Sequence, residues 1–239
     1  MLNVPPVVTV TLVVMGLVHA VRVWLLSPRA DIELLKFFSF VPGRYEMAAQ
    51  CGVPSGLAVD SWTFVSYALI HGDVTHLGVN AVWFLAFGSA VARRFHAARF
   101  LIFFAVTAAA GAGMHLLTRG PECVPMVGAS AAISGCMAAA IRFAFQRGGP
   151  LGLWRAPDTH AYHVPAAPLL IAITDPRVLA FLVVWFALNI LLGVGSLSLA
   201  GEQQAVAWQA HIGGFLAGLL LFPWFDPVAP ADRERSPDG

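Results

Sequence analysis

Charged side chains are scarce in this sequence of 239 residues. Only 11% of the residues are charged, whereas 58% are hydrophobic and the mean hydropathy is +0.75. A soluble domain usually carries about 25% charged residues, because its surface must be hydrated. The shortage excludes a conventional soluble domain and predicts an integral membrane protein. The net charge of +1 also gives no basic surface that would indicate nucleic-acid binding.

Cysteine is scarce as well. The three cysteines are too few for a disulfide scaffold, and their spacing does not resemble a metal site. The cysteines therefore do not indicate a metal site. Cys51 and Cys123 could pair if both face an oxidising compartment, but two free thiols are the favoured expectation.

Long apolar segments dominate what is present. A membrane-spanning helix needs about 20 largely apolar residues, and the first such segment lacks the preceding basic region of a signal peptide, so we expect it to be retained. The sequence predicts an all-α integral membrane protein, a six-transmembrane-helix bundle over residues 1–226, followed by a short disordered cytoplasmic tail at 227–239. The six predicted spans are 6–26, 74–92, 99–118, 128–146, 177–198 and 205–225.

Basic residues predict the orientation of these spans. Eight Lys and Arg residues fall on the side that holds both termini, and four fall on the other side. Cytoplasmic loops are enriched in Lys and Arg, so both termini should be cytoplasmic and the loop at 27–61 external. That loop is long enough that we expect it to be structured and partly embedded at the membrane interface. A bacterial inner membrane is the expected location, because no transit peptide or long soluble extension is evident.

Polar side chains gather at one depth in this arrangement. The second, fourth and sixth spans all run from outside to inside, and each begins with a polar motif. The second opens with HGDVTHLGVN, the fourth with GASAAISG, and the sixth carries His211 about two turns in. At about 1.5 Å per residue, all three groups lie in the outer half of the bilayer. Polar groups inside spans are costly and usually line a hydrated cavity.

These residue types suggest nucleophilic catalysis. A serine beside a histidine forms a nucleophile and its base, which predicts Ser130 and His211 as partners. His76 and Asn80 share one helix face and can both donate hydrogen bonds to an oxyanion. Ser130 also lies at a helix N-terminus, where free backbone N–H groups favour negative charge. The alternative is that these residues only form hydrogen bonds that pack the helices together, and we assign Ser134 to that structural role.

Small residues make close contact between the fourth and sixth spans plausible. Gly214 and Gly218 form a GxxxG pattern that begins three residues after His211, and the fourth span is rich in Ala, Ser and Gly. Such residues let helix backbones approach closely. The approach would bring a short serine side chain within reach of the histidine.

Together these motifs resemble the rhomboid intramembrane serine proteases over about residues 6–225. The match consists of HGDVTHLGVN, GASAAISG and AHIGGFLAG, in that order along the chain. The resemblance implies a catalytic Ser130–His211 dyad without a carboxylate, and an oxyanion site formed by His76, Asn80 and the Ser130 N–H group. His71, Gly128, Ala131, Gly214 and Gly218 would support this site. The partners would be the lipid bilayer and single-span membrane proteins cleaved near the outer face, while the oligomeric state remains unpredicted. The resemblance implies neither a metal ion nor a cofactor.

The sequence departs from the family pattern after the nucleophile. Ala131 stands where the family usually has glycine, which would be strained if that position needed a positive φ and harmless if it lies within the helix. Ser134 stands where some members carry an aromatic residue that stacks on the histidine, so His211 has no evident orienting partner.

Two other functions compete with proteolysis. A rhomboid-like pseudoprotease would bind membrane helices without cutting them, and Ala131 is the one feature in its favour. A transporter or proton channel would usually show an acidic residue within a span or an internal repeat, and neither is visible. For a protease, we expect the fifth span and the GEQQ loop at 201–204 to move and admit the substrate.

Overall fold

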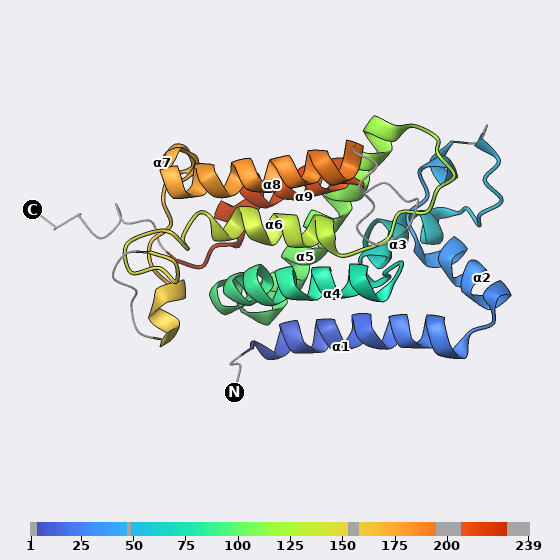
Figure 1. The fold of residues 1–239 in the computed structure, drawn as a ribbon, viewed down its shortest axis with the longest axis horizontal. Coiled ribbons are helices and arrows are strands. Elements are labelled where there is room, and N and C mark those ends of the chain that lie inside the picture. The colour runs from blue at the N-terminus through green and yellow to red at the C-terminus, as the bar shows by residue number, and fades with distance from the viewer. Residues whose placement is uncertain (1–3, 47–48, 153–157, 195–206, 229–239) are drawn as a thin grey trace, which may run out of the picture.

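The computed structural model describes residues 4–46, 49–152, 158–194 and 207–228, and these residues form helices and no β-strand (Figure 1). The described part of the chain is therefore all-α, as predicted. Its elements are α1 (Pro6–Ala20), η1 (Val21–Leu25), α2 (Pro28–Phe38), η2 (Pro42–Tyr45), α3 (Leu57–Ser66), η4 (Tyr67–Leu69), α4 (Val74–Trp83), η5 (Phe84–Gly88), α5 (Ser89–Arg119), α6 (Ser130–Ala140), η6 (Asp158–Tyr162), α7 (Leu169–Thr174), α8 (Pro176–Val194) and α9 (Trp208–Phe225).

Among the residues that the structure describes, two helical segments are long and apolar enough to cross a membrane by themselves, at Pro6–Leu25 and Val74–Arg119. The second is interrupted at His96, whose φ of 61° and ψ of 169° are not helical. This break separates the predicted second and third spans. The other predicted spans also fall on helices, but the apolar helices Ser130–Ala140 and Pro176–Leu191 are shorter. The number of spans thus stays a prediction.

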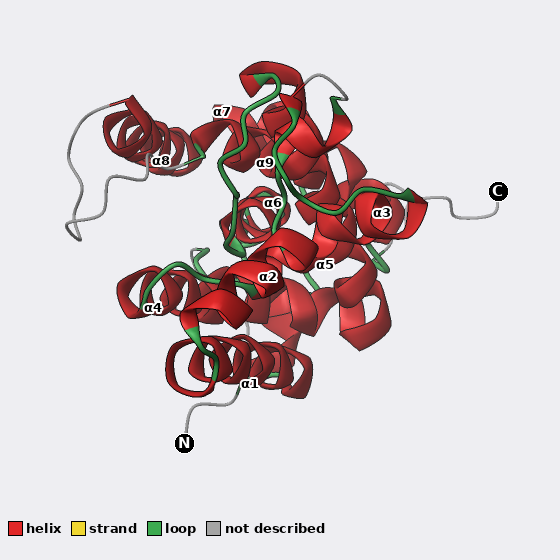
Figure 2. Ribbon diagram, turned by 90° about the vertical axis from the view of Figure 1, so that its right-hand side faces the viewer, coloured by secondary structure: helices red, strands yellow, loops and turns green. Residues whose placement is uncertain are grey.

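Helices α5, α6 and α9 form the centre of the bundle, and Figure 2 shows α6 surrounded by its neighbours. Every residue of α6 from Ala131 to Ala140 is buried. A Cβ atom added at Gly214 would overlap the Ala131 backbone, and one added at Gly218 would overlap the Gly135 backbone. The two helices therefore touch through their main chains, as small residues at facing positions allow.

Helix α8 packs less completely than the central helices. Its inward residue Trp185 stacks on Phe215 of α9 at 4.8 Å between ring centroids, and Phe181 contacts Phe87 of η5 at 5.6 Å. Its other side exposes apolar side chains such as Val183 and Ile190. Figure 2 shows this helix at the edge of the bundle. The exposed apolar side is the kind of surface that lipid would cover.

The loop between α1 and α4 is built as a structured cap at one end of the bundle (Figure 1). Buried Arg44 organises it by donating hydrogen bonds to the carbonyl groups of Lys36 and Pro54, at 2.6 and 2.9 Å. The ring of Phe40 packs on Tyr45 and lies in the core. The expectation of a structured loop is therefore correct for its described residues. None of the residues of α2 is buried, and its apolar residue Ile32 is exposed.

Cys51 and Cys123 form a disulfide, so the expectation of two free thiols was wrong. The cause lies in tertiary contacts that sequence spacing does not reveal. Phe40 and Met126 form an antiparallel backbone bridge, and the Gly43 N–H donates to the Glu122 carbonyl at 2.8 Å. These contacts bring the loop between α1 and α4 beside the segment that leads to α6. Disulfides persist in oxidising compartments, which fits an external position for this loop.

An ion pair closes the opposite end of the bundle. Arg94 is fully buried, and its Nε and Nη2 donate to the two carboxylate oxygens of Asp226, each at 2.8 Å. Its Nη1 donates to the carbonyl groups of Tyr162 and Val164. A buried charge needs such complete pairing. The pair therefore ties the α5 break, the loop after α6 and the end of α9 together.

Removing the disulfide should destabilise the protein. It closes a loop of 72 residues, and disulfides typically contribute about 2–4 kcal/mol. We expect the Cys51→Ser variant to unfold at a lower temperature in detergent than the wild type, as measured by differential scanning fluorimetry. A reducing agent should lower the midpoint of the wild type and leave that of the variant unchanged. Equal midpoints for oxidised and fully reduced wild type would contradict this role.

Adding one methyl group between α6 and α9 should be costly. In Gly218→Ala the new Cβ meets the Gly135 backbone, which cannot move aside as a side chain can, and overpacking of this kind costs about 1–3 kcal/mol or more. Gly16→Ala is the matched control, because nothing lies within 4 Å of its added Cβ. Thermal unfolding should show a lower midpoint for Gly218→Ala and no loss for Gly16→Ala. Equal behaviour of the two variants would show that the backbone contact is not tight.

Candidate active site

Ser130 begins α6 directly after a turn that only glycine fits. Gly128 has a φ of 116°, and a Cβ atom there would lie 2.6 Å from Nε2 of His76. Its N–H donates to the Tyr67 carbonyl at 3.0 Å, which fixes the turn to η4. The absence of a side chain at Gly128 therefore lets the His76 ring lie against the backbone just before the serine.

Ser130 and His211 form a hydrogen bond. The distance between Ser130 Oγ and His211 Nε2 is 2.7 Å. His211 lies near the start of α9, and the main-chain contacts at Gly214 and Gly218 hold this helix against α6. The spacing suits proton transfer from a serine nucleophile to a histidine base. The two side chains, 81 residues apart in the sequence, thus meet where two helix backbones touch.

The second ring nitrogen of His211 is also bonded. Its Nδ1 lies 2.5 Å from Oδ1 of Asn189 in α8. The other end of this amide, Nδ2, donates to the Trp185 carbonyl one turn earlier at 2.8 Å. The sequence patterns predicted neither the role of Asn189 nor any partner that orients His211. The available signal was an amide residue inside an otherwise apolar span.

His76 and Asn80 lie one turn apart on α4. Asp73 caps this helix by accepting a hydrogen bond from the His76 N–H at 2.8 Å. Asn80 is buried, and its Nδ2 donates to the His76 carbonyl at 2.9 Å. An amide nitrogen carries two hydrogens, so this bond occupies one of the two. His76 therefore lies beside the turn before Ser130, and Asn80 lies one turn deeper.

His71 lies between the first helix and α4. Its carbonyl accepts a hydrogen bond from Arg22 Nη1 at 2.8 Å and lies 3.3 Å from Nδ1 of His19. Arg22 in turn pairs with Asp31 of α2 at 2.6 Å. Burial, aided by the neighbouring His76, lowers the pKa of His71 to about 3, so this ring stays neutral at physiological pH. His71 therefore links the site to the loop between α1 and α4.

Ala131 lies within α6 and needs no positive φ. Among the described residues other than glycine, only Gln50 and His96 have a positive φ. The Ala131 methyl instead faces Gly111 of α5, where a Cβ atom would lie 2.5 Å away. Of the two alternatives that the sequence left open, the harmless position within the helix is therefore the one that Ala131 occupies, and its backbone is unstrained. Ser134 Oγ donates to the Ser130 carbonyl at 2.7 Å, which is an internal helix bond.

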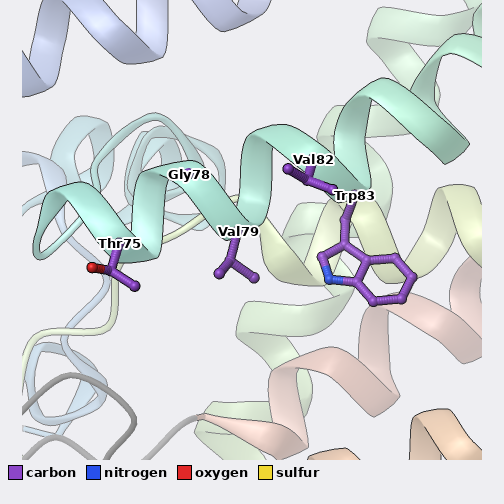
Figure 3. Close-up of a pocket in the computed structure, with 5 residues that line it drawn as sticks. All are labelled: Thr75, Gly78, Val79, Val82 and Trp83. Carbon is purple, nitrogen blue, oxygen red and sulfur yellow. The ribbon is translucent and has the colours of Figure 1, made fainter.

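An open apolar pocket of about 390 Å³ lies along α4, and its lining does not include His76 or Asn80. Figure 3 shows that Thr75, Val79 and Trp83 project from the same side of this helix. Gly78 and Val82 complete the lining. Ser130 and His211 do not line it either, so the pocket is separate from the serine–histidine pair.

The fold and the residue pattern can be compared with known families. The family model described as Rhomboid domain matches residues 59–225, which include Ser130, His211, His76 and Asn80. No curated protein sequence is similar enough to the chain to count as a relative. Members of the matched family are generally intramembrane serine proteases. The match covers well over half of the chain, and the protein therefore belongs to the rhomboid family.

Proposed function

We propose that this protein is an intramembrane serine endopeptidase that cleaves single-span membrane proteins near the outer face of the membrane. The observation that carries the proposal is the 2.7 Å hydrogen bond between Ser130 Oγ and His211 Nε2. A nucleophile and a base within hydrogen-bond distance are the minimum equipment for acyl transfer. Family membership supports the same reaction class.

The reaction would proceed through an acyl-enzyme. Ser130 Oγ attacks the carbonyl carbon of the scissile peptide bond while His211 Nε2 takes the hydroxyl proton. The tetrahedral intermediate collapses as His211 passes that proton to the leaving amine. Water then attacks the ester with His211 again as base, which releases the carboxylic acid product and regenerates Ser130.

The oxyanion would form at the start of α6. The Ser130 N–H is one of the helix-terminal donors that have no partner within the helix. His76 lies against Gly128, close to this position, and Asn80 keeps a second amide hydrogen available one turn below. Donors placed around a developing negative charge stabilise the transition state. We therefore assign His76 and Asn80 to the oxyanion site.

Topology would give the site its water. We propose six spans with both termini cytoplasmic, in a bacterial inner membrane. The start of α1 and the end of α9 lie at one end of the bundle, and α2 and α3 lie at the other (Figure 1). The disulfide at the α2–α3 end supports an oxidising external side. The predicted cytoplasmic tail at 227–239 lies almost wholly outside the described residues.

The pseudoprotease alternative depends on Ala131. A strained residue after the nucleophile would have favoured it, and the helical position of Ala131 removes that argument. Binding without cleavage also requires no hydrogen bond between a serine and a histidine. The geometry therefore favours the protease over the helix-binding alternative.

Replacing either member of the pair should abolish cleavage. We expect Ser130→Ala and His211→Ala to cut a single-span substrate at least about 10³-fold more slowly than the wild type, since these residues act as a unit. Ser134→Ala is the matched control, because its hydroxyl bonds its own helix. Full cleavage by Ser130→Ala would refute the proposal. If folded wild type does not cleave, the pseudoprotease alternative gains support, and Ala131→Gly tests whether glycine restores activity.

Substrate would enter past α8. Its outward side is exposed and apolar, and the pocket on α4 offers an apolar surface beside the bundle. The loop at 201–204, which we expect to move with α8, lies outside the described residues. A substrate helix could thus reach the serine sideways from the bilayer if the outer part of α8 moves away from α4.

Linking the outer ends of α4 and α8 should block membrane substrates alone. We expect a bifunctional thiol reagent across Thr75→Cys and Leu191→Cys to reduce cleavage at least about tenfold, a barrier increase of about 1.4 kcal/mol. Phe87→Cys with Phe181→Cys is the control, because these rings already touch at the other end of α8. A small fluorophosphonate should still label Ser130 in both cross-linked variants. Undiminished cleavage in the fully linked outer pair would rule out this route.

A further inference from the structure

We infer that Asn189 is a positioning residue for His211: its amide oxygen holds the imidazole so that Nε2 faces Ser130. This inference rests on the proposed function and deepens it. It adds a third residue, from a third helix, to an arrangement that the family resemblance described as a dyad.

The hydrogen-bond chain fixes the direction of each partner. Asn189 Nδ2 donates to the Trp185 carbonyl at 2.8 Å, which turns Oδ1 toward the histidine ring. An amide oxygen can only accept, so His211 Nδ1 must carry the hydrogen in their 2.5 Å contact. In a neutral imidazole, Nε2 then holds the lone pair. The lone pair lies 2.7 Å from Ser130 Oγ, where a general base must be.

The burial of Asn189 indicates that its amide is retained for the hydrogen bonds that it makes. Asn189 is 7% exposed and is surrounded along its span by apolar residues. A polar amide in such a place is unfavourable unless its groups are bonded. Both ends of this amide are bonded, one to its own helix and one to His211. The amide oxygen is the only acceptor atom of this side chain, and it therefore accepts its hydrogen bond from the catalytic histidine.

Packing holds the two helices in the register that this bond needs. Trp185, which accepts the amide hydrogen through its carbonyl, stacks its ring on Phe215 at 4.8 Å. Phe215 lies four residues after His211, one turn along the same face of α9. The stacked pair and the hydrogen-bonded pair thus lie next to each other and fix α8 against α9 at the site.

The chemistry differs from that of a serine–histidine–aspartate triad. A neutral amide orients the ring and selects its tautomer, but it does not neutralise the imidazolium that forms during attack. The hydrogen stays on Nδ1 throughout, because the amide oxygen does not take it. Loss of Asn189 should consequently slow the chemical step and leave substrate binding intact.

Kinetics of substitutions at position 189 test this role. We expect Asn189→Leu to lower kcat about 10–100-fold, the loss found when the hydrogen-bond partner that orients a metal-bound histidine is removed, with KM changed less than about twofold. Asn189→Asp, which restores an acceptor, should exceed Asn189→Leu in kcat. Leu188→Ala, at an exposed neighbouring position on α8, should match the wild type. Wild-type kcat in Asn189→Leu, or equal kcat in the Leu and Asp variants, would overturn the inference.

A spectroscopic measurement separates this inference from the proposed function. In ¹⁵N-histidine-labelled wild type, NMR should show His211 protonated at Nδ1, whether or not the protein cleaves any substrate. In Asn189→Leu the signal should shift toward a mixture of tautomers, whereas Leu188→Ala should keep the wild-type signal. An unchanged His211 signal in Asn189→Leu would refute the positioning role even if the protein is an active protease. An inactive wild type with this signal would refute the proposed function alone.

Discussion

Helices α6 and α9 touch through their main chains at Gly214 and Gly218, and the placement of the two site residues depends on this contact. Ser130 has a short side chain, so its hydroxyl reaches His211 only if the two helices nearly touch. Glycine at 214 and 218 removes the side chains that would otherwise hold the helices apart. In a membrane, where apolar side chains gain little by leaving lipid, such close packing is a main source of helix association. The same contacts therefore stabilise the bundle and bring the two residues together.

The polar groups of the site are held by partners drawn from several helices. His211 is bonded on both ring nitrogens, and the Asn189 amide is bonded on both its ends. This complete hydrogen bonding matters because an unpaired polar group inside a bilayer is costly. It also connects the histidine to α8, which packs less completely than the central helices α5, α6 and α9. A displacement of α8 that separates Asn189 from the ring would remove one of the two hydrogen bonds that orient the base.

The cap formed by the loop between α1 and α4 and the opposite end of the bundle are closed by different chemistry. On the cap side, a disulfide and backbone bonds join the first loop to the segment before Ser130. At the other end, the buried Arg94–Asp226 pair joins residues that are 132 positions apart. Each connection fixes segments that the helices alone would leave independent, and together they limit how far the termini of α5, α6 and α9 can move.

Much of this arrangement could be predicted from local patterns. Apolar length indicated the helices, the GxxxG spacing indicated the α6–α9 contact, and the polar motifs indicated Ser130, His211 and His76. Features that depend on tertiary placement could not be predicted. The Cys51–Cys123 disulfide depends on a backbone bridge between distant loops, and the role of Asn189 depends on the rotation of α8 about its axis. A lone asparagine in an apolar span is visible in the sequence, but its partner is not.

The site of covalent labelling by a fluorophosphonate, which reacts with activated serines, tests the catalytic pair. The folded protein would be labelled in detergent and the modified peptide identified by mass spectrometry. We expect a single adduct on Ser130 that is lost in His211→Ala, because the hydroxyl is nucleophilic only beside its base. An adduct on another serine, or equal labelling of Ser130 without His211, would contradict the catalytic pair.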